Sequence, residues 1–241
     1  MGRRPAVAVV VPTYNEAENL PVLVRRLFAL DIPNTRLIVV DDGSPDGTGE
    51  VADRLSRQLS GRIELIQRGR KLGLGTAYVA GFSRALAEGA DYVFQMDADL
   101  SHSPEYLPDF LQRLGEADVV VGSRYMPGGG VDETWGVMRR LLSLCGNLGI
   151  RMITGLRVKD ATSGFKAFRA TVLRSLDLAQ FHCKGFGFQT EVAHACQIKG
   201  YQVVEHPIVF ASRANGSSKM SLAIVIEALW RLLPLRWKRI R

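Results

Sequence analysis

Two patterns of apolar and polar positions alternate along the first half of the chain. Short runs of apolar, largely β-branched residues, typical of buried strands, are each followed by a segment whose apolar residues recur at helical spacing. The expected strands cover residues 6–12, 37–42, 63–67, 92–97 and 118–123, and the expected helices cover residues 20–30, 51–59, 76–89 and 104–115. Strands that alternate with helices form a mainly parallel sheet covered by helices on both faces. The pattern therefore predicts an α/β fold built as a single Rossmann-like domain.

The alternation weakens after residue 126. The expected features there are a glycine-rich loop at 127–130, a helix at about 135–153, the segment 160–169, a helix that runs through 191–198 and a last strand at 201–210. With 241 residues, of which 46% are hydrophobic, the chain is long enough to bury a substantial core in one large domain. We expect this second half to complete the same domain.

Polar segments follow four of the expected strands at the point where each strand ends. They are PTYNE at 12–16, DDGSPDG at 41–47, DAD at 97–99 and SRY at 123–125. The carboxyl ends of parallel strands meet at one edge of a sheet, and ligands bind there where the strand order switches. We therefore expect these four segments to form a single site.

Asp97 and Asp99 are the strongest candidates for binding a metal. Side chains two positions apart in an extended chain share a face, so both carboxylates point the same way at the end of a strand. A cation relieves their mutual repulsion, and hard carboxylate ligands favour Mg²⁺ or Mn²⁺ with phosphates and water completing the shell. The alternative is an acidic loop in solvent. Asp41 and Asp42, at the end of a neighbouring strand, favour the metal.

The formal net charge of +7 suits a partner that carries phosphates: a nucleic acid, an anionic membrane surface or a phosphorylated small molecule. Nucleic acid is disfavoured, because the basic residues do not alternate with aromatic residues as they do on binding platforms. Three cysteines without a CxxC pair are typical of reduced thiols in the cytosol. Without a bilayer-length apolar run or a cleavable signal peptide, the expected location is cytoplasmic.

Six motifs occur in order along the chain: VVVPTYNEAENL, VVDDGSPDGT, MDADLSHSPE, VGSRY, TSGFKAFR and RANGSSKM. This ordered set spans residues 6–221 and resembles the inverting family 2 glycosyltransferases of GT-A fold, most closely the polyprenol-phosphate (dolichol-phosphate) mannose synthases. Cellulose and hyaluronan synthases of the same family also carry a QxxRW motif, which this sequence lacks. The resemblance implies a catalytic domain over 1–221 and a basic amphipathic tail over 222–241.

The same resemblance implies roles for individual residues. The nucleotide sugar is expected to contact Pro12, Tyr14, Glu16, Asp41, Asp97, Ala98 and Asp99, together with Arg213 and Lys219 on a loop that closes over the donor. The divalent metal that clamps the diphosphate, Mg²⁺ or Mn²⁺, is expected at Asp97 and Asp99. Ser101 stands where related enzymes can carry a glutamine ligand, so its hydroxyl or a water completes that position. The acceptor phosphate is expected at Arg124, Arg139 and Ser143.

The implied reaction moves mannose from GDP-mannose to a polyprenyl phosphate and gives a β-linked product, with Asp97, Asp99, Arg124 and Arg139 as catalytic residues. A divalent cation and guanidinium groups stabilise the charge on the leaving group. A phosphate monoester has a second pKa of about 6, so at neutral pH it is largely dianionic and needs orienting cations rather than a base. Two alternatives stay open: UDP-glucose as the donor, and a nucleotide-sugar sensor without transferase activity.

A polyprenyl acceptor resides in a membrane, and two segments are candidates for reaching it. The tail 222–241 interleaves apolar residues, including Trp230 and Trp237, with basic ones, which is typical of a helix lying on anionic lipid. The segment 137–153 is the second candidate, for which a core-packing helix with a basic solvent face is an equal alternative. We expect peripheral attachment to the cytoplasmic face of a membrane, with or without a membrane partner protein.

Overall fold

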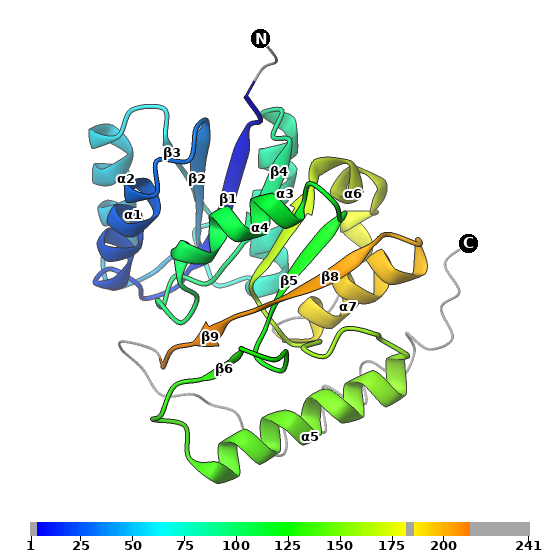
Figure 1. Cartoon of the computed structure of the whole chain (residues 1–241). Coiled ribbons are helices and arrows are strands. Elements are labelled where there is room, and N and C mark those ends of the chain that lie inside the picture. Colours follow the sequence, from blue (N-terminus) through cyan, green and yellow to red (C-terminus); the bar gives the residue numbers. More distant parts are fainter. Residues whose placement is uncertain (1–3, 182–185, 213–241) are drawn as a thin grey trace.

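A seven-stranded sheet forms the centre of the fold, in the order β3-β2-β1-β4-β7-β5-β8 (Figure 1). The computed structural model describes residues 4–181 and 186–212. The strands of the sheet are β1 (Val7–Thr13), β2 (Thr35–Asp41), β3 (Ile63–Gln67), β4 (Tyr92–Gln95), β5 (Val119–Ser123), β7 (Lys166–Arg169) and β8 (Val203–Pro207). Neighbouring strands are parallel except at β7, which runs antiparallel to β4 and β5. The prediction of a mainly parallel sheet is confirmed.

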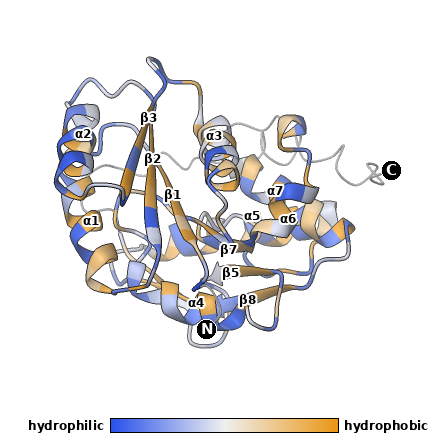
Figure 2. Cartoon of the chain, turned by 90° about the horizontal axis from the view of Figure 1, so that it is seen from above, coloured by the Kyte–Doolittle hydropathy of each residue, from blue (hydrophilic) through white to orange (hydrophobic). Residues whose placement is uncertain are grey.

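Helices cover both faces of this sheet, as the view from above shows (Figure 2). The core cluster on one face includes residues of α1 (Asn19–Ala29), α2 (Thr48–Gln58) and α4 (Leu107–Arg113). The cluster on the other face includes residues of α3 (Leu74–Ala87), α6 (Ala170–Ser175) and α7 (Phe186–Ile198). Two short 3₁₀ turns, η1 (Pro104–Tyr106) and η2 (Leu178–Gln180), complete the connections. The expected α/β layering is therefore correct.

The continuous apolar run of β1 reflects burial on both faces of the sheet. Val9 packs into the α1 side of the core and Val10 into the α3 side, and both are fully buried. A strand covered on both faces needs apolar residues at every position rather than at alternate ones. Helix α3 approaches β1 closely at Gly81, where an added Cβ would overlap the Val10 side chain. A glycine at this position therefore permits the helix to pack on the strand.

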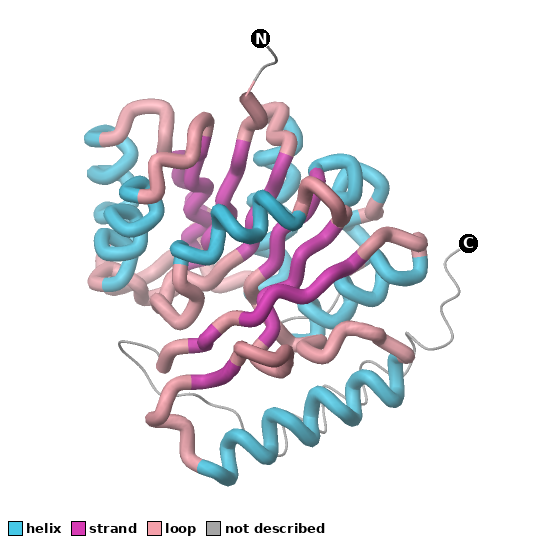
Figure 3. The backbone as a smooth tube through the Cα atoms, viewed as in Figure 1, coloured by secondary structure: helices cyan, strands magenta, loops and turns pink. Residues whose placement is uncertain are grey.

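Two features of the second half differ from the expectation. β7 lies within the segment 160–169 and separates β4 from β5, whereas no strand was expected there. The expected last strand at 201–210 is two strands: β8 in the main sheet, and β9 (Val209–Phe210), which pairs with β6 (Gly130–Val131) in a second small sheet (Figure 3). Pro207, which has no N–H to donate to a ladder, ends β8. The chain therefore leaves the main sheet just before β9.

Helix α5 (Val137–Thr154) lies beside the small sheet, apart from the other helices (Figure 1). It ends at Gly155, whose φ of 73° is the left-handed conformation common after helix C-termini. In the described part of the chain, no helix combines the length and the apolar character needed to cross a bilayer. Arg213, Lys219 and the tail 222–241 lie outside the described residues, so the division of the chain at residue 221 stays a prediction.

Candidate active site

Asp41 joins two of the predicted loops at the carboxyl edge of the sheet. Its side chain is buried, with Thr13 Oγ1 donating to it at 2.9 Å and Ser44 Oγ at 2.5 Å. The backbone N–H groups of Gly43 and Ser44 donate to the other carboxylate oxygen at 3.1 and 3.0 Å. A carboxylate that accepts four hydrogen bonds fixes the shape of both loops. Direct contact between Asp41 and a nucleotide stays a prediction.

The loop at 12–16 presents an aromatic ring and a cation at this edge. Tyr14 is 37% exposed, and Lys71 Nζ lies 3.7 Å from the centre of its ring. The neighbouring Glu16 is held in place from both sides, since its N–H donates to Thr48 Oγ1 at 2.9 Å and its carboxylate accepts from Asn19 Nδ2 at 2.8 Å. Pro12 is half-buried at the end of β1. Lys71 was not predicted for the site, although it stands in the basic run RGRK.

Asp97 is held by residues from two other elements. The Tyr78 hydroxyl of α3 donates to Asp97 Oδ1 at 2.8 Å, and the Asp97 N–H donates to His102 Nδ1 at 3.1 Å. Burial, and after it the Asp97 charge, raises the pKa of Tyr78 well above its ordinary value, so Tyr78 stays a donor. Gly164 leaves room at the carboxylate, because a Cβ there would lie 3.3 and 3.4 Å from the two Asp97 oxygens. The carboxylate is therefore oriented and uncrowded.

Asp99 lies on a tight turn after the end of β4. It is 5% exposed, and Ser101 donates to its Oδ1 twice, from N–H at 3.1 Å and from the hydroxyl at 2.5 Å. Between them Leu100 has a φ of 62°, the left-handed conformation that costs a non-glycine residue about 1 to 3 kcal/mol. Ala98 is buried between the two aspartates. Ser101 thus orients Asp99, and its expected role as a metal ligand stays a prediction.

The two aspartates offer carboxylate oxygens for only part of a coordination shell. Within residues 4–181 and 186–212, no group of three or more His, Cys, Asp or Glu side chains is arranged to hold a metal ion. Mg²⁺ and similar ions are commonly bound by one or two carboxylates together with substrate phosphates. The Asp97 side chain is 30% exposed, which leaves part of the carboxylate accessible to such a ligand. These residues therefore fit a divalent cation that binds together with a diphosphate.

His102 lies beside the DAD turn but is absent from the predicted site, because a histidine after a strand end is more often a hydrogen-bonded loop residue. Here it is 2% exposed, stacked on Phe165 at a ring separation of 5.2 Å and edge-on to Phe210 at 5.4 Å. Burial lowers the pKa of His102, with the charges of Asp97 and Asp99 opposing that shift and those of Arg124 and Lys166 adding to it. With Nδ1 accepting from the Asp97 N–H, neutral His102 carries its proton on Nε2.

Arg124 forms a buried ion pair that the sequence did not predict. Its Nε and Nη2 donate to the two oxygens of Asp160, each at 2.7 Å, and its backbone N–H donates to the same carboxylate at 3.0 Å. The side chains are 8% and 0% exposed. Burial lowers the pKa of Arg124, but the Asp160 charge and the hydrogen bonds to Asp160 together outweigh it, so the net shift is upward. Burial raises the pKa of Asp160, but the Arg124 charge and its hydrogen bonds together lower it below the ordinary value, so the pair is charged at neutral pH.

Ser143 and Arg139, the other two predicted acceptor residues, lie on α5. Ser143 is buried, and its hydroxyl lies 2.7 Å from the hydroxyl of Tyr125, the residue next to Arg124. The guanidinium carbon of Arg139 lies 3.7 Å from the centre of the Trp135 ring, a cation–π contact. The structure thus brings Ser143 next to the strand end that carries Arg124. Arg139, one turn before Ser143 in α5, is anchored over Trp135, which precedes the helix.

Phe210 of β9 connects the DAD turn to the predicted acceptor residues. Its ring contacts His102 at 5.4 Å and Trp135 at 5.9 Å, and the guanidinium carbon of Arg124 lies 5.4 Å from its centre. The next residue, Ala211, donates its N–H to the Ser101 carbonyl at 3.2 Å. The segment after β8 therefore contacts the loop of the DAD turn, through Ser101 and His102, and also Arg124, which places both at one edge of the sheet.

Lys166 is a buried cation beneath this edge. It pairs with Gln95 across the β4–β7 ladder, and its Nζ donates to Gln189 Oε1 at 2.8 Å and to the Ser163 carbonyl. Burial lowers the pKa of Lys166 to about 7, against the opposing effect of Asp160. The motif TSGFKAFR contains Lys166, but the sequence did not indicate that it is buried.

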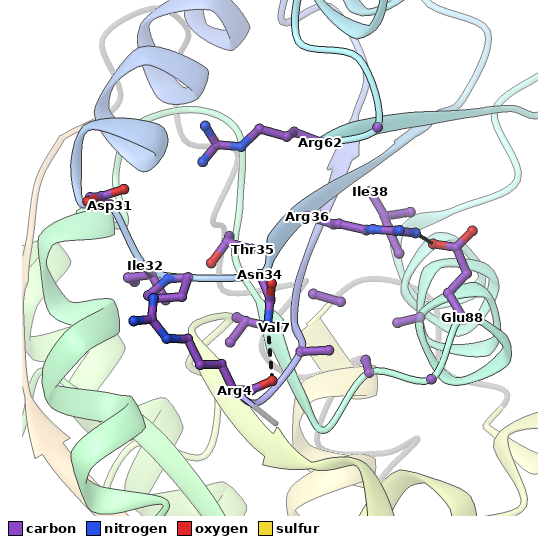
Figure 4. Close-up of a pocket in the computed structure, with 17 residues that line it drawn as sticks. Arg4, Val7, Asp31, Ile32, Asn34, Thr35, Arg36, Ile38, Arg62 and Glu88 are labelled. Atoms are coloured by element: carbon purple, nitrogen blue, oxygen red, sulfur yellow. Dashed lines mark hydrogen bonds and ion pairs between the residues drawn. The ribbon is translucent and has the colours of Figure 1, made fainter. Parts of the chain in front are cut away.

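A cavity of about 630 Å³ lies at the opposite edge of the sheet, at the start of β1 and β2 (Figure 4). None of the predicted site residues lines it. Two of its arginines already have partners: Arg36 donates to Glu88 at 2.8 Å, and the Arg62 guanidinium lies 4.0 Å from the Phe28 ring. The cavity is therefore separate from the site at the carboxyl edge.

Residues 8–177 match the protein family described as "Glycosyl transferase family 2", and this range contains the DAD turn and the Arg124–Asp160 pair. The chain belongs to this family. It is therefore a glycosyltransferase, and the resemblance inferred from the ordered motifs is confirmed.

Two curated relatives are similar over nearly the whole chain. An undecaprenyl-phosphate mannosyltransferase of Micrococcus luteus is 42% identical over 239 residues, which cover 98% of this chain and 97% of the relative. A polyprenol monophosphomannose synthase of Mycolicibacterium smegmatis is 42% identical over 225 residues, which cover 93% of this chain and 84% of the relative. Both relatives belong to the branch that the motifs indicated.

Solved structures confirm the GT-A fold. A mannosyl-3-phosphoglycerate synthase from Rubrobacter xylanophilus superposes with a TM-score of 0.69 at 19% identity and covers 98% of this chain and 76% of that protein. A glucosyl-3-phosphoglycerate synthase from Mycobacterium tuberculosis, solved in complex with Mn²⁺, UDP and phosphoglyceric acid, superposes with a TM-score of 0.68 at 17% identity. The superposition covers 98% of this chain and 78% of that protein. At these identities the likeness concerns the fold alone.

Proposed function

We propose that this glycosyltransferase moves mannose from GDP-mannose to a polyprenyl phosphate. The observation that carries the proposal is the placement of Arg124 and Ser143 beside the DAD turn, with a helix that exposes apolar side chains next to them. Such a site can hold a nucleoside diphosphate and a lipid-linked phosphate at the same edge of the sheet. The names of two relatives at 42% identity, a polyprenol monophosphomannose synthase and an undecaprenyl-phosphate mannosyltransferase, support mannose as the sugar and a polyprenyl phosphate as the acceptor.

On the donor side, we propose that Asp97 and Asp99 hold a divalent cation, Mg²⁺ or Mn²⁺, with the donor diphosphate. When bound, this cation neutralises charge that develops on the leaving group. Tyr78 and Ser101 orient the two carboxylates for that purpose. The Mn²⁺ and UDP bound by the M. tuberculosis relative of the same fold support a divalent metal.

The rest of the donor is proposed to contact the two loops that Asp41 orders. Pro12, Tyr14 and Glu16 lie on one loop, Asp41 begins the other, and Ala98 separates the two aspartates. The Tyr14 ring is accessible for stacking on a base, and Lys71 beside it supplies positive charge. Arg213 and Lys219, proposed to close over the donor, lie outside the described residues.

On the acceptor side, we propose that Arg124, Arg139 and Ser143 bind the phosphate of the polyprenyl phosphate. Asp160 takes up Nε and Nη2 of Arg124, which fixes the plane of the guanidinium and directs its remaining edge away from the pair. A planar, fixed guanidinium is well suited to phosphate oxygens. The phosphate is largely dianionic at neutral pH, with a second pKa of about 6, so it can attack the sugar without a protein base.

Helix α5 supports peripheral attachment to a membrane. Most of its large apolar residues point outward, with Met138 78% exposed and Leu144 and Leu148 each 50% exposed, whereas the polar Ser143 and Asn147 are buried. This is the reverse of a surface helix in water, whose apolar stripe faces the core. We propose that this face, together with the tail 222–241, lies on an anionic lipid surface at the cytoplasmic face of the membrane. A partner protein in the membrane is an alternative that would cover the same face.

Flotation with anionic liposomes tests this attachment. We expect Leu144→Glu/Leu148→Glu to reduce lipid binding several-fold, because each change removes apolar area and adds negative charge. Ile198→Glu, at a 43% exposed position in α7, is the matched control and should float like the wild type. Deletion of 222–241 measures the share of the tail. Unchanged flotation of the double variant would contradict the role of α5.

The proposed reaction is tested by incubating the protein and Mn²⁺ with a short polyprenyl phosphate and either GDP-mannose or UDP-glucose. We expect a mannosylated lipid from GDP-mannose and at least about tenfold less product from UDP-glucose, since two bases and two sugars must be discriminated. A preference for UDP-glucose would overturn the mannose assignment while leaving the acceptor assignment in place. Transfer to no polyprenyl phosphate would overturn the acceptor assignment.

A further inference from the structure

The hydroxyl of Thr162 lies at the centre of the acceptor side. It accepts from Arg124 Nη2 at 2.9 Å and from Asn147 Nδ2 at 3.2 Å, and it donates to Asp160 Oδ1 at 3.4 Å. A hydroxyl offers one donor and two acceptor positions. All three are therefore in use, two toward the buried ion pair and one toward α5.

The hydrogen bond between Thr162 and Asn147 is important because, among the described residues, few contacts hold α5 in position. The large apolar residues of this helix are mostly exposed, so its inward face consists largely of polar groups, among them Ser143, Asn147 and Thr154. Asn147 Nδ2 also donates to the Ser143 carbonyl at 3.2 Å, and the Ser143 hydroxyl reaches Tyr125 at 2.7 Å. Hydrogen bonds are directional, whereas apolar contacts are not. The position of α5 relative to Arg124 therefore depends on a few polar contacts.

We propose that Thr162 is a positioning residue for the acceptor phosphate. Its hydroxyl joins the Arg124–Asp160 pair to Asn147, and through it fixes the helix that carries Ser143 and Arg139 in one register with Arg124. Of the residues proposed to bind the phosphate, Arg124 follows the end of β5, whereas Arg139 and Ser143 lie on α5, so a shift of α5 relative to β5 separates them. This inference rests on the proposed acceptor, and it adds the residue that aligns the two halves of the phosphate site.

The competing explanation is that Thr162 only fills space. Valine has nearly the same shape without the hydroxyl, and serine keeps the hydroxyl without the methyl group, so the two substitutions separate shape from hydrogen bonding. A residue that only packs would tolerate Thr162→Val better than Thr162→Ser. A positioning residue predicts the opposite order. Thr154→Val is the matched control, because Thr154 is a buried threonine of α5 whose hydroxyl donates within the helix to the Ile150 carbonyl at 2.7 Å.

The experiment measures initial rates of mannose transfer with acceptor and donor varied separately. For Thr162→Val we expect the KM for a short polyprenyl phosphate to rise about tenfold, as expected for one hydrogen-bonded link, while the KM for GDP-mannose stays within about twofold. Thr162→Ser and Thr154→Val should keep both constants close to the wild type. An unchanged acceptor KM in Thr162→Val, or equal rises in both KM values, would overturn the inference.

A double-mutant cycle tests the route through α5. If Thr162 acts through Asn147, then Asn147→Ala raises the acceptor KM by a similar factor, and Thr162→Val/Asn147→Ala is no worse than the larger single effect. Multiplicative effects would mean that the two residues act independently, which contradicts the proposal. The activity of the wild type distinguishes failure of the proposed function from failure of this inference. No mannolipid from the wild type overturns the proposed function and this inference with it, whereas an active wild type and an unaffected Thr162→Val overturn this inference alone.

Discussion

The buried Arg124–Asp160 pair makes a quantitative prediction about stability. Asp160→Asn keeps the shape of the side chain and removes its charge, which leaves the Arg124 guanidinium, 8% exposed, without a counter-ion. Asp160 is what raises the pKa of Arg124, but an arginine side chain keeps its proton in proteins even without such a partner, so the guanidinium of the variant stays charged. Breaking a buried pair in this way costs about 3–5 kcal/mol. For a chain of this length, that corresponds to a loss of about 6–20 °C in Tm.

Thermal and urea unfolding followed by circular dichroism measure this loss. The matched control is Asp53→Asn, which removes the exposed i,i+4 pair of Asp53 with Arg57, whose side chains are 53% and 72% exposed. Exposed pairs of this kind contribute about 0.5 kcal/mol or less, so the control should unfold almost like the wild type. Equal effects of the two substitutions would refute the interpretation of Arg124–Asp160 as a buried, mutually dependent pair.

The double variant Arg124→Met/Asp160→Asn separates stability from function. With both charges of the pair removed, we expect it to recover most of the stability that Asp160→Asn loses. Transfer should remain at background, because the guanidinium proposed to hold the acceptor phosphate is gone. A double variant that is less stable than Asp160→Asn, or one that transfers mannose at the wild-type rate, would contradict the roles given to the pair.

Two further predictions concern the groups around the DAD turn. Tyr78→Phe removes the donor to Asp97 Oδ1, so we expect Mn²⁺ with GDP to bind about tenfold more weakly by calorimetry, and unchanged affinity would contradict the orienting role of Tyr78. Burial lowers the pKa of Lys166 from 10.5 to about 7, so between these values the unfolded chain binds more protons than the folded one and stability rises with pH. Lys166→Met should flatten this rise in urea unfolding between pH 7 and pH 10, and a slope equal to that of the wild type would exclude Lys166 as its cause.

The parts of the fold that the sequence predicts are those in which local pattern and burial agree. β1 and β2 are buried on both faces, so their apolar runs are unambiguous, and the loops after them lie at the same edge because the strands are parallel. The spacing of Asp97 and Asp99 indicates a shared direction for the same local reason. β7 was missed because four residues, KAFR, are too short for a period, and its burial depends on the neighbouring β4 and β5.

The parts of the site that the sequence does not reveal depend on contacts distant in the chain. Asp160 is 36 residues from Arg124, and nothing near either residue indicates the pairing. His102 is buried by Phe165 and by Phe210, which lies more than a hundred positions away. Helix α5 has the expected amphipathic composition, but only the structure shows that its polar side faces inward.

The central claim is that Asp97 and Asp99 bind the metal and diphosphate of the donor at the same edge of the sheet where Arg124 binds the acceptor phosphate. A crystal of the protein with Mn²⁺, GDP and a short polyprenyl phosphate tests it directly, because anomalous scattering locates the metal. We predict a manganese peak about 2.2 Å from carboxylate oxygens of Asp97 and Asp99, and the acceptor phosphate in contact with the Arg124 guanidinium. A manganese peak away from both carboxylates, or an acceptor phosphate bound elsewhere, would contradict the claim.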